Sequence, residues 1–384
     1  MRILFIIPSL GSGGGAERSL TEMLPEFAKA GLDTTTAFFF QSPSDLEEKL
    51  REQRLDVRHI AARGYVGRIR GVRRLIRKLM PDVVHTQVFE ADLIGRIAAV
   101  GSRTTVVSSL INTSYDPVRL RDPNIRPTRL RAARFLDRWT ARHLTDRFHA
   151  ITMAAKDAAM QSFGLAADRI TVVTRGRDPR RLGEPSADRK RRARRALDID
   201  DETAVVVSVG RNAFQKGHRH LIPAFEQVAR THPDVLLLVA GREGPETPVL
   251  RELIGRSEFA DRIRLLGQRD DVPEVLAAAD VFAFPSLYEG LGGSVVEALA
   301  MGLPVVASDL PAVREVLAEG EVGILVPPEA PFALADAITR VLDDPELARS
   351  LGHRGQQRFQ ERYMLDQVVT EMVGFYRSLD RSVT

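Results

Sequence analysis

The chain has 384 residues, of which 44% are hydrophobic and 28% are charged. This length exceeds that of a usual single domain, so we expect two domains with separate cores. The absence of cysteine excludes disulfides and cysteine metal sites, and no apolar run reaches the length needed to span a bilayer. Because no signal peptide is visible, we expect a cytoplasmic protein with peripheral membrane contact at most.

The charge is distributed unevenly along the chain. Residues 1–200 contain 37 Lys and Arg against 23 Asp and Glu, a net +14, whereas residues 201–384 contain 18 against 28, a net −10. The amino-terminal half should therefore attract an anionic partner, such as a phosphorylated or lipid-phosphate acceptor or a membrane surface. Nucleic acid is not expected, because no aromatic stacking set or basic repeat accompanies the charge. An arginine-rich source composition would explain the same asymmetry.

The first half alternates strands and helices, as a doubly wound parallel sheet requires. The predicted strands are residues 3–8, 34–40, 56–60, 82–87, 105–113, 148–152 and 170–178. A glycine-rich turn at residues 11–15 joins the first strand to an amphipathic helix, and such a turn can bring backbone amides against a phosphate or a sugar. Its spacing matches neither the dinucleotide fingerprint nor the P-loop.

Two segments of the first half are rich in arginine. In Val66–Met80, apolar residues recur at helical spacing while Arg and Lys fill the other positions, which predicts a basic amphipathic helix. Such a helix could dock on an anionic membrane or could simply pack on the sheet with its charges solvated. Residues 115–147 contain the only tryptophan, Trp139, and are predicted to form a loop and then a helix; a long loop beside a cleft often handles an acceptor.

Polar residues lie at or near the ends of two predicted strands of the first half. His85 lies close to the end of one strand, and Asn112 and Thr113 end the next. Ligands of open parallel sheets bind outside the carboxyl ends of the strands, so these three residues are candidates for acceptor binding. Each could equally be an ordinary, hydrogen-bonded loop residue.

A second alternation of strands and helices begins near residue 203. We expect a first domain at residues 1–178, a linker with a short basic helix at 179–202, and a second doubly wound domain at 203–364. The final helix, within residues 365–384, could pack back on the first domain. Two Rossmann-like α/β domains of this kind imply a central cleft between them.

The most informative stretch is the turn that follows the predicted strand at residues 281–285. Glu289 and Glu297 flank a glycine-rich segment, and a helix is predicted to begin near Val295. Gly292, Gly293 and Ser294 would present unpaired backbone N–H groups at that helix N-terminus, where the dipole favours an anion or sugar hydroxyls. We predict a ligand-binding corner here, the alternative being an ordinary connection with two exposed glutamates.

A second candidate site follows the first strand of the second domain, where Arg211 and Lys216 lie in one loop. Arginine offers a planar fork and lysine a compact mobile charge, so together they can hold a diphosphate. Cations placed there would stabilise a departing diphosphate without a metal, and no Asp-x-Asp site of the metal-binding kind is evident. A surface ion pair is the alternative.

Four segments together resemble glycosyltransferase family 4. They are residues 289–298, Gly210-Arg211 with Lys216-Gly217, residues 14–18 and residues 81–85. The resemblance implies a GT-B fold and a retaining, metal-independent transferase that uses a nucleotide sugar and no cofactor.

The resemblance also implies residue roles. Arg211 and Lys216 would grip the diphosphate, Glu289 would hold donor-sugar hydroxyls, and Glu297 would bind the ribose. Further donor contacts are implied at Gly14, Gly15, Arg269, Gly290, Leu291, Gly292, Gly293 and Ser294. In the mechanism usually drawn for the family, the departing phosphate oxygen takes the acceptor proton, so no general base from the protein is required.

The sequence departs from the family pattern at two places. Asn112 stands where many relatives have a histidine that contacts the donor sugar, and residues 175–178 read Arg-Gly-Arg-Asp where relatives often have Asn-Gly-Val-Asp. The leading hypothesis is a retaining transferase moving a hexose-type sugar from a UDP- or GDP-sugar to an anionic or lipid-linked acceptor. A catalytically silent nucleotide-sugar-binding subunit and a nucleotide-sugar epimerase are the alternatives.

Overall fold

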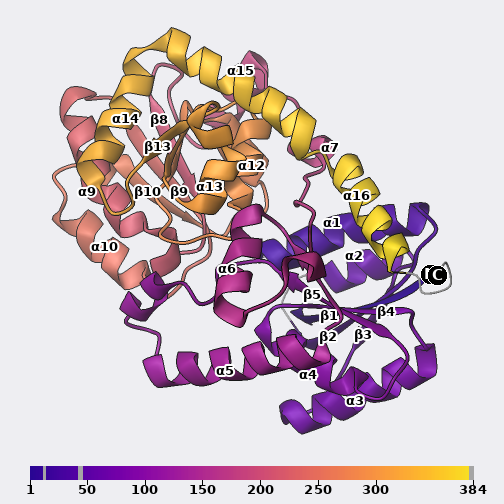
Figure 1. Cartoon of the computed structure of the whole chain (residues 1–384). Coiled ribbons are helices and arrows are strands. Elements are labelled where there is room, and N and C mark those ends of the chain that lie inside the picture. Colours follow the sequence, from indigo (N-terminus) through magenta and orange to yellow (C-terminus); the bar gives the residue numbers. More distant parts are fainter. Residues whose placement is uncertain (12–13, 42–45, 380–384) are drawn as a thin grey trace. The chain divides into compact units, whose positions relative to one another are not determined.

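The structure, a computed structural model, describes residues 1–11, 14–41 and 46–379. Ser12 and Gly13 of the predicted glycine-rich turn lie outside these residues, as does Ser44, the first residue of a helix that the polar segment at residues 44–54 predicts. The chain divides into two compact units (Figure 1). The first unit comprises Met1–Asp116, Ile125–Gly176 and Leu365–Thr384, and the second comprises Pro117–Asn124 and Arg177–Met364.

The first unit contains a parallel sheet with strand order β3-β2-β1-β4-β5-β6-β7. The strands are β1 (Arg2–Ser9), β2 (Asp33–Phe40), β3 (Asp56–His59), β4 (Val83–Gln87), β5 (Thr105–Leu110), β6 (Arg147–Ala150) and β7 (Ile170–Val172). Alternate residues of β1 face opposite sides: Phe5 belongs to one hydrophobic cluster, and Leu4 and Ile6 belong to another. Both faces of the sheet are therefore buried, which explains the continuous apolar runs in the sequence.

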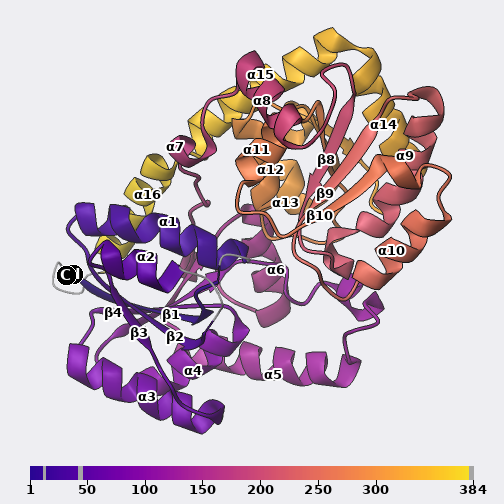
Figure 2. The same ribbon diagram turned by 180° about the vertical axis from the view of Figure 1, so that it is seen from behind.

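Helices cover both faces of this sheet. They are α1 (Gly15–Lys29), α2 (Leu46–Glu52), α3 (Gly64–Leu79), α4 (Phe89–Ala99), α5 (Pro127–Leu144), α6 (Met153–Phe163) and α16 (Leu365–Ser378). In both ribbon views α1, α2 and α16 lie on one side of the strands, and α3, α4 and α5 lie on the other (Figures 1 and 2). The last helix of the chain thus completes the core of the first unit, where Tyr376 is fully buried.

The second unit contains a parallel sheet with strand order β10-β9-β8-β11-β12-β13. Its strands are β8 (Val205–Val209), β9 (Leu236–Ala240), β10 (Ile263–Gly267), β11 (Val281–Phe284), β12 (Val305–Ser308) and β13 (Ile324–Val326). Its helices are α7 (Pro179–Leu182), α8 (Ala187–Ala196), α9 (His218–Thr231), α10 (Thr247–Arg256), α11 (Val272–Ala277), α12 (Gly293–Ala300), α13 (Pro311–Val316), α14 (Pro331–Asp343) and α15 (Pro345–Arg362). The strand order reverses between β8 and β11, and in sheets of this kind ligands bind beyond the strand ends at such a point.

Two strands of the first unit end three or more residues earlier than the sequence predicts. The chain leaves β5 after Leu110 and leaves β7 after Val172. At the first of these ends, the Asn112 side chain accepts the backbone N–H of Thr113 at 2.9 Å. This local hydrogen bond offers the backbone an alternative to the ladder, so the residues beyond Leu110 form a loop.

None of the helices within the described ranges is long and apolar enough to cross a membrane.

Candidate functional site

The glycine-rich corner of the second unit joins β11 to α12. Gly292 precedes the helix with φ of 89°, a left-handed conformation that favours glycine. A Cβ at Gly293 would lie 2.3 Å from a guanidinium nitrogen of Arg177, so the arginine lies directly against the start of the helix. The Ser294 hydroxyl donates to the Val209 carbonyl at 3.0 Å and fixes the helix start to the end of β8.

Glu289 and Lys216 form a single ion pair in this corner. The Lys216 Nζ lies 2.5 Å from Glu289 Oε1, and the Ser286 hydroxyl donates to the same oxygen at 2.9 Å. The side chains of Lys216 and Glu289 are 21% and 7% exposed, so the ammonium remains the accessible partner. The Lys216 ammonium also lies 5.2 Å from the centre of the Phe284 ring, within the range of a cation–π contact.

The backbone holds the two loops of this ion pair together. Leu287 N donates to Gln215 O at 2.8 Å, and the Gln215 side chain donates to Tyr288 O at 2.9 Å. Gly217 has φ of +61°, and a Cβ there would lie 2.0 Å from Pro285 O. Glycine is therefore required for this close approach, and Lys216 is positioned by the fold rather than by its pairing alone.

Arg211 lies in the loop after β8 and forms no ion pair with an acidic residue in the described part of the chain. Partial desolvation lowers its pKa and the positive charge of Arg242 lowers that pKa further, while Tyr288 and the carboxylate of Asp122 act in the opposite direction. Within residues 1–11, 14–41 and 46–379, neither guanidinium forms an ion pair. Asn212 N donates to Arg242 O at 3.1 Å, which brings the two loops together. Two cations at the ends of β8 and β9 that form no ion pair among the described residues are suited to an anion.

Arg242 was not predicted from the sequence. It lies between Gly241 and Gly244, and a Cβ at these glycines would lie 1.9 Å from Gly210 O and 2.3 Å from Asn212 O, respectively. A cation between two glycines after a buried strand is the signal that would have indicated it.

Glu297 lies in a buried cluster with two arginines. Its Oε1 accepts from Arg177 Nε at 2.9 Å and from Arg181 at 3.2 Å, and the residue is only 2% exposed. Sequence reasoning identified Arg177 as a departure from the family pattern but did not pair it with Glu297. In this structure the carboxylate predicted to bind ribose is held by arginines of its own chain.

The remaining predicted donor residues differ in their surroundings. Gly290 and Leu291 are buried in the loop before α12. Arg269 follows β10 and pairs with Asp271 at 2.5 Å, which raises the pKa of Arg269. In the first unit, Gly14 precedes α1 in an extended conformation and Gly15 begins that helix.

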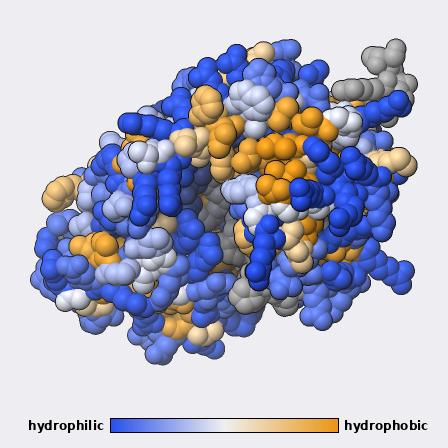
Figure 3. All heavy atoms as spheres, turned by 90° about the horizontal axis from the view of Figure 1, so that it is seen from below, coloured by the Kyte–Doolittle hydropathy of each residue, from blue (hydrophilic) through white to orange (hydrophobic). Residues whose placement is uncertain are grey.

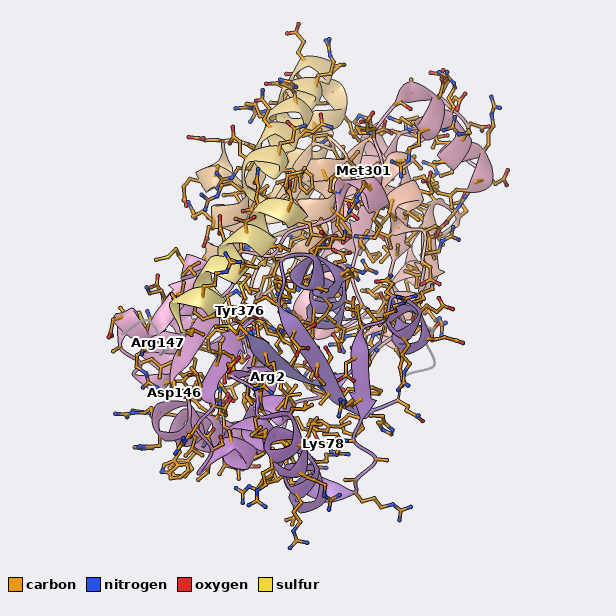
Figure 4. The ribbon with its side chains drawn as sticks, turned by 90° about the vertical axis from the view of Figure 1, so that its right-hand side faces the viewer. Arg2, Lys78, Asp146, Arg147, Met301 and Tyr376 are labelled. Carbon is orange, nitrogen blue, oxygen red and sulfur yellow. The ribbon has the colours of Figure 1, made fainter. Side chains whose placement is uncertain are left out.

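His85 lies in the core of the first unit rather than at an accessible edge. Its Nδ1 is 2.6 Å from the Tyr376 hydroxyl and its Nε2 is 2.7 Å from the Ser109 hydroxyl. Burial holds the pKa of His85 well below its ordinary value, and it lowers the pKa of His149 in the same network to about 4. The position of His85 near a strand end was misleading because Tyr376 projects from α16 onto that strand (Figure 4).

The other residues predicted to bind the acceptor lie in the loop after β5. Asn112 and Thr113 are half-buried there. Near the glycine-rich turn, the Arg175 guanidinium donates to Gly15 O at 3.3 Å and to Gln87 Oε1 at 3.2 Å. Arg175 thus connects the start of α1 to the end of β4. Among the described residues, no group of three or more His, Asp or Glu side chains could hold a metal ion.

Comparison with known proteins agrees with this architecture. A model described as Glycosyltransferase Family 4 matches residues 13–181, and one described as Glycosyl transferases group 1 matches residues 189–358. The alpha-maltose-1-phosphate synthase of Mycolicibacterium smegmatis is 31% identical over 77% of this chain and 79% of its own length. The alpha-D-kanosaminyltransferase of Streptomyces kanamyceticus is 29% identical over 63% of this chain, which spans 64% of that relative.

Solved structures share the whole fold. The crystal structure of Anabaena HepE in complex with UDP and glucose superposes with a TM-score of 0.85 at 24% identity, covering 98% of this chain and 100% of that one. Sucrose-phosphate synthase from Thermosynechococcus elongatus has a TM-score of 0.83 at 22% identity, covering 98% of both chains.

Two doubly wound parallel units define an α/β protein of the GT-B class, and the predicted fold class is confirmed. The chain belongs to glycosyltransferase family 4, which confirms the resemblance seen in the sequence.

Proposed function

We propose that the chain is a retaining, metal-independent transferase that moves a hexose-type sugar from a nucleoside diphosphate to an acceptor. The observation that carries this proposal is the cationic loop of the second unit. Lys216 is fixed against Glu289 at 2.5 Å, while Arg211 has a second guanidinium, that of Arg242, beside it. A diphosphate supplies the charge that this loop lacks.

In the proposed reaction, the bond between the sugar and the diphosphate breaks and a bond from the same carbon to an acceptor oxygen forms. The electron pair of the broken bond stays on the departing phosphate oxygen, which takes the acceptor proton. Arg211 and Lys216 stabilise the negative charge that grows there, an effect worth about 3–4 kcal/mol for one well-placed group in comparable sites. No protein side chain has to act as a general base.

Glu289 positions the donor sugar by accepting hydrogen bonds from the hydroxyl groups of that sugar. Its Oε1 accepts hydrogen bonds from both Ser286 and Lys216, so little reorganisation is needed when the sugar binds. The backbone amides at Gly293 and Ser294 lie at the start of α12 and would meet a phosphate or sugar oxygen. Glu297 would accept hydrogen bonds from the ribose hydroxyls while Arg177 and Arg181 hold its carboxylate in place.

The nucleoside diphosphate of the donor is proposed to be UDP or GDP. Structures of Anabaena HepE in complex with UDP and with UDP-glucose support UDP as the first candidate. The names of relatives point to different acceptors, including D-inositol 3-phosphate in Corynebacterium glutamicum and 2-deoxystreptamine in Streptomyces kanamyceticus. The net +14 of residues 1–200 favours an anionic or lipid-linked acceptor.

A peripheral contact between α3 and an anionic membrane is part of the same proposal. Lys78 is exposed on this helix, and Figure 4 shows it at the outer side of the first unit. The cleft expected between the two domains stays a prediction.

The proposal is tested in two stages. UDP, GDP and ADP are first compared for thermal stabilisation of the protein, and the stabilising nucleotide then selects a panel of nucleotide sugars. We expect release of the nucleoside diphosphate and formation of a glycoside, whose anomeric configuration is read by NMR. Binding without any turnover of the panel would instead indicate a silent subunit, and a changed sugar still attached to its nucleotide would indicate an epimerase.

A further inference from the structure

Helix α5 of the first unit exposes three large apolar side chains. Phe135 is 68% exposed, Leu136 45% and Trp139 50%. These three residues, called the α5 apolar patch below, lie within about one turn of each other on the helix. Exposing them to water is unfavourable, and a contiguous exposed apolar patch usually marks an interaction surface.

The orientation of α5 is fixed by a buried polar cluster on its opposite side. The Asp137 carboxylate lies 2.7 Å from a guanidinium nitrogen of Arg96 and accepts from the Tyr115 hydroxyl at 2.9 Å. Arg96 also donates to the Thr140 hydroxyl at 3.1 Å, and it is only 1% exposed. Rotating α5 to bury its apolar patch would break these hydrogen bonds and leave buried charges unpaired. The patch is therefore held outward by the fold.

Arginines flank the apolar patch along one side. Arg131, Arg134, Arg138 and Arg142 are all exposed. None of the four side chains forms an ion pair with a residue in the described part of the chain. The helix contains one acidic residue, Asp137, and that carboxylate is buried in the cluster with Arg96. The exposed surface of α5 therefore combines bulky apolar groups with positive charge alone.

Helix α3 differs from α5 although both pack against α4. Its apolar residues Val72 and Ile76 are buried in the core, and its Arg73 donates to the Ile97 carbonyl at 2.9 Å. The apolar residues in the middle of α3 are thus already covered by the core. Its exposed apolar side chains, Tyr65 and Val66, lie in its first turn, whereas the exposed Arg74, Arg77 and Lys78 lie in its second half. In both ribbon views α3 and α5 lie on the same side of the sheet (Figures 1 and 2).

We propose that α5 binds the surface of an anionic lipid bilayer, with the α5 apolar patch inserted at the level of the headgroups. Aromatic side chains favour this interface, and the four arginines pair with lipid phosphates around them. A view of the molecule from below shows several groups of hydrophobic side chains on a mainly hydrophilic surface (Figure 3). Such binding, which rests on the proposed function, would bring the transferase to a membrane-borne acceptor. Lipid binding itself can be measured without donor or acceptor.

Trp139 is a built-in probe for this proposal because it is the only tryptophan of the chain. The protein is mixed with vesicles of phosphatidylcholine alone or of phosphatidylcholine with phosphatidylglycerol. We expect Trp139 emission to shift to shorter wavelength and to be shielded from acrylamide only with the anionic vesicles. Binding should weaken as salt is raised, because screening reduces the attraction of arginines to lipid phosphates.

Variants separate this surface from other exposed residues. Phe135→Ser combined with Leu136→Ser, and Arg134→Gln combined with Arg138→Gln, should each reduce sedimentation with anionic vesicles by about ten-fold or more. The matched control is Phe332→Ser, because Phe332 is 72% exposed on α14 of the second unit. This control should bind anionic vesicles as the unmodified protein does. All variants should have the melting temperature of the unmodified protein.

Three outcomes would overturn the proposal. The unmodified protein could fail to bind anionic vesicles, which would leave a protein partner as the occupant of the α5 apolar patch. It could bind while Trp139 emission stays unchanged, or the α5 variants could bind as well as the Phe332→Ser control. Nucleotide stabilisation measured on the same samples shows separately whether the donor site of the proposed function is present, so the two proposals fail independently.

Discussion

The two units contain polar clusters of opposite character. In the first unit, His85, Ser109, His149 and Tyr376 form a closed network in which the ring nitrogens of both histidines have hydrogen-bond partners. In the second unit, the cluster around Lys216 includes two arginines, Arg211 and Arg242, that form no ion pair in the described part of the chain. Both sheets are parallel and doubly wound, so topology alone does not separate a core network from a ligand site.

The polar clusters of the two units differ in their charge and in their exposure to solvent. Burial lowers the pKa values of both histidines of the first unit, so they stay neutral and cost little to enclose. In the second unit, the charges of Arg211 and Arg242 repel each other, and the proposed diphosphate would relieve this repulsion. An unbalanced, partly exposed charge is therefore the better indicator of function.

The largest effect on sugar transfer is expected when the cation of Lys216 is removed from its loop. Lys216→Ala should reduce transfer by about 10³-fold or more, because the growing charge on the diphosphate loses one of its cations. Turnover of the nucleotide sugar is measured with and without acceptor. Lys29→Ala is the matched control, since Lys29 forms an exposed ion pair with Glu26 at 2.7 Å. Normal turnover in the Lys216 variant would end the diphosphate assignment.

The buried cluster of Glu297 gives the next largest effect. Arg177→Ala removes one of its two cations and should lower the free energy of unfolding by about 3 kcal/mol, because a buried carboxylate loses a partner. Urea unfolding measures the loss, and UDP stabilisation measures whether nucleotide affinity falls with it. The neighbouring Arg180→Ala is the control, because that side chain is 74% exposed. Equal stability of the two variants would contradict a structural role for Arg177.

The fold was predictable because buried parallel strands are continuous apolar runs bounded by turn residues. The strand predicted at residues 281–285, for example, is observed at Val281–Phe284. The pairing of Arg177 with Glu297 was not predictable, because the two residues are 120 positions apart and meet only through the packing of α7 on α12. The environment of His85 depends in the same way on Tyr376, 291 positions away.

Arg242 was missed for a different reason. Its own segment resembles an ordinary turn, and its importance comes from the neighbouring strand, which brings Arg211 beside it. The residues that a single loop carries, such as Glu289 and Ser294, were identified because local spacing determines where they lie. Residues that act in pairs across loops require the three-dimensional structure.

Acidification should destabilise both units through their buried histidines. The pKa of His149 is lowered to about 4 and that of His218 to about 3, against 6.5 in an unfolded chain. Below pH 6.5 the unfolded chain binds protons that the folded chain does not, so stability is fully present above that pH and is lost as pH falls towards 4. Each histidine contributes about 1.4 kcal/mol per pH unit at most.

The measurement is the free energy of unfolding from pH 7 to pH 5. His149→Asn should flatten this pH dependence in the first unit and His218→Asn in the second, whereas His353→Asn, an exposed histidine on α15, should leave it unchanged. An unaltered slope in both buried variants would show that these histidines are protonated in the folded state.

The smallest effect concerns the closed network itself. Tyr376→Phe removes the hydroxyl that lies 2.6 Å from His85 Nδ1 and leaves a buried ring nitrogen without its partner, which should cost about 1–2 kcal/mol. The control is Tyr65→Phe, because Tyr65 is 45% exposed. Transfer by the folded Tyr376 variant should match that of the unmodified protein, since the network is proposed to be structural. If transfer falls while stability is preserved, His85 returns as a functional residue, and the contrast between a neutral core network and a charged ligand site no longer holds.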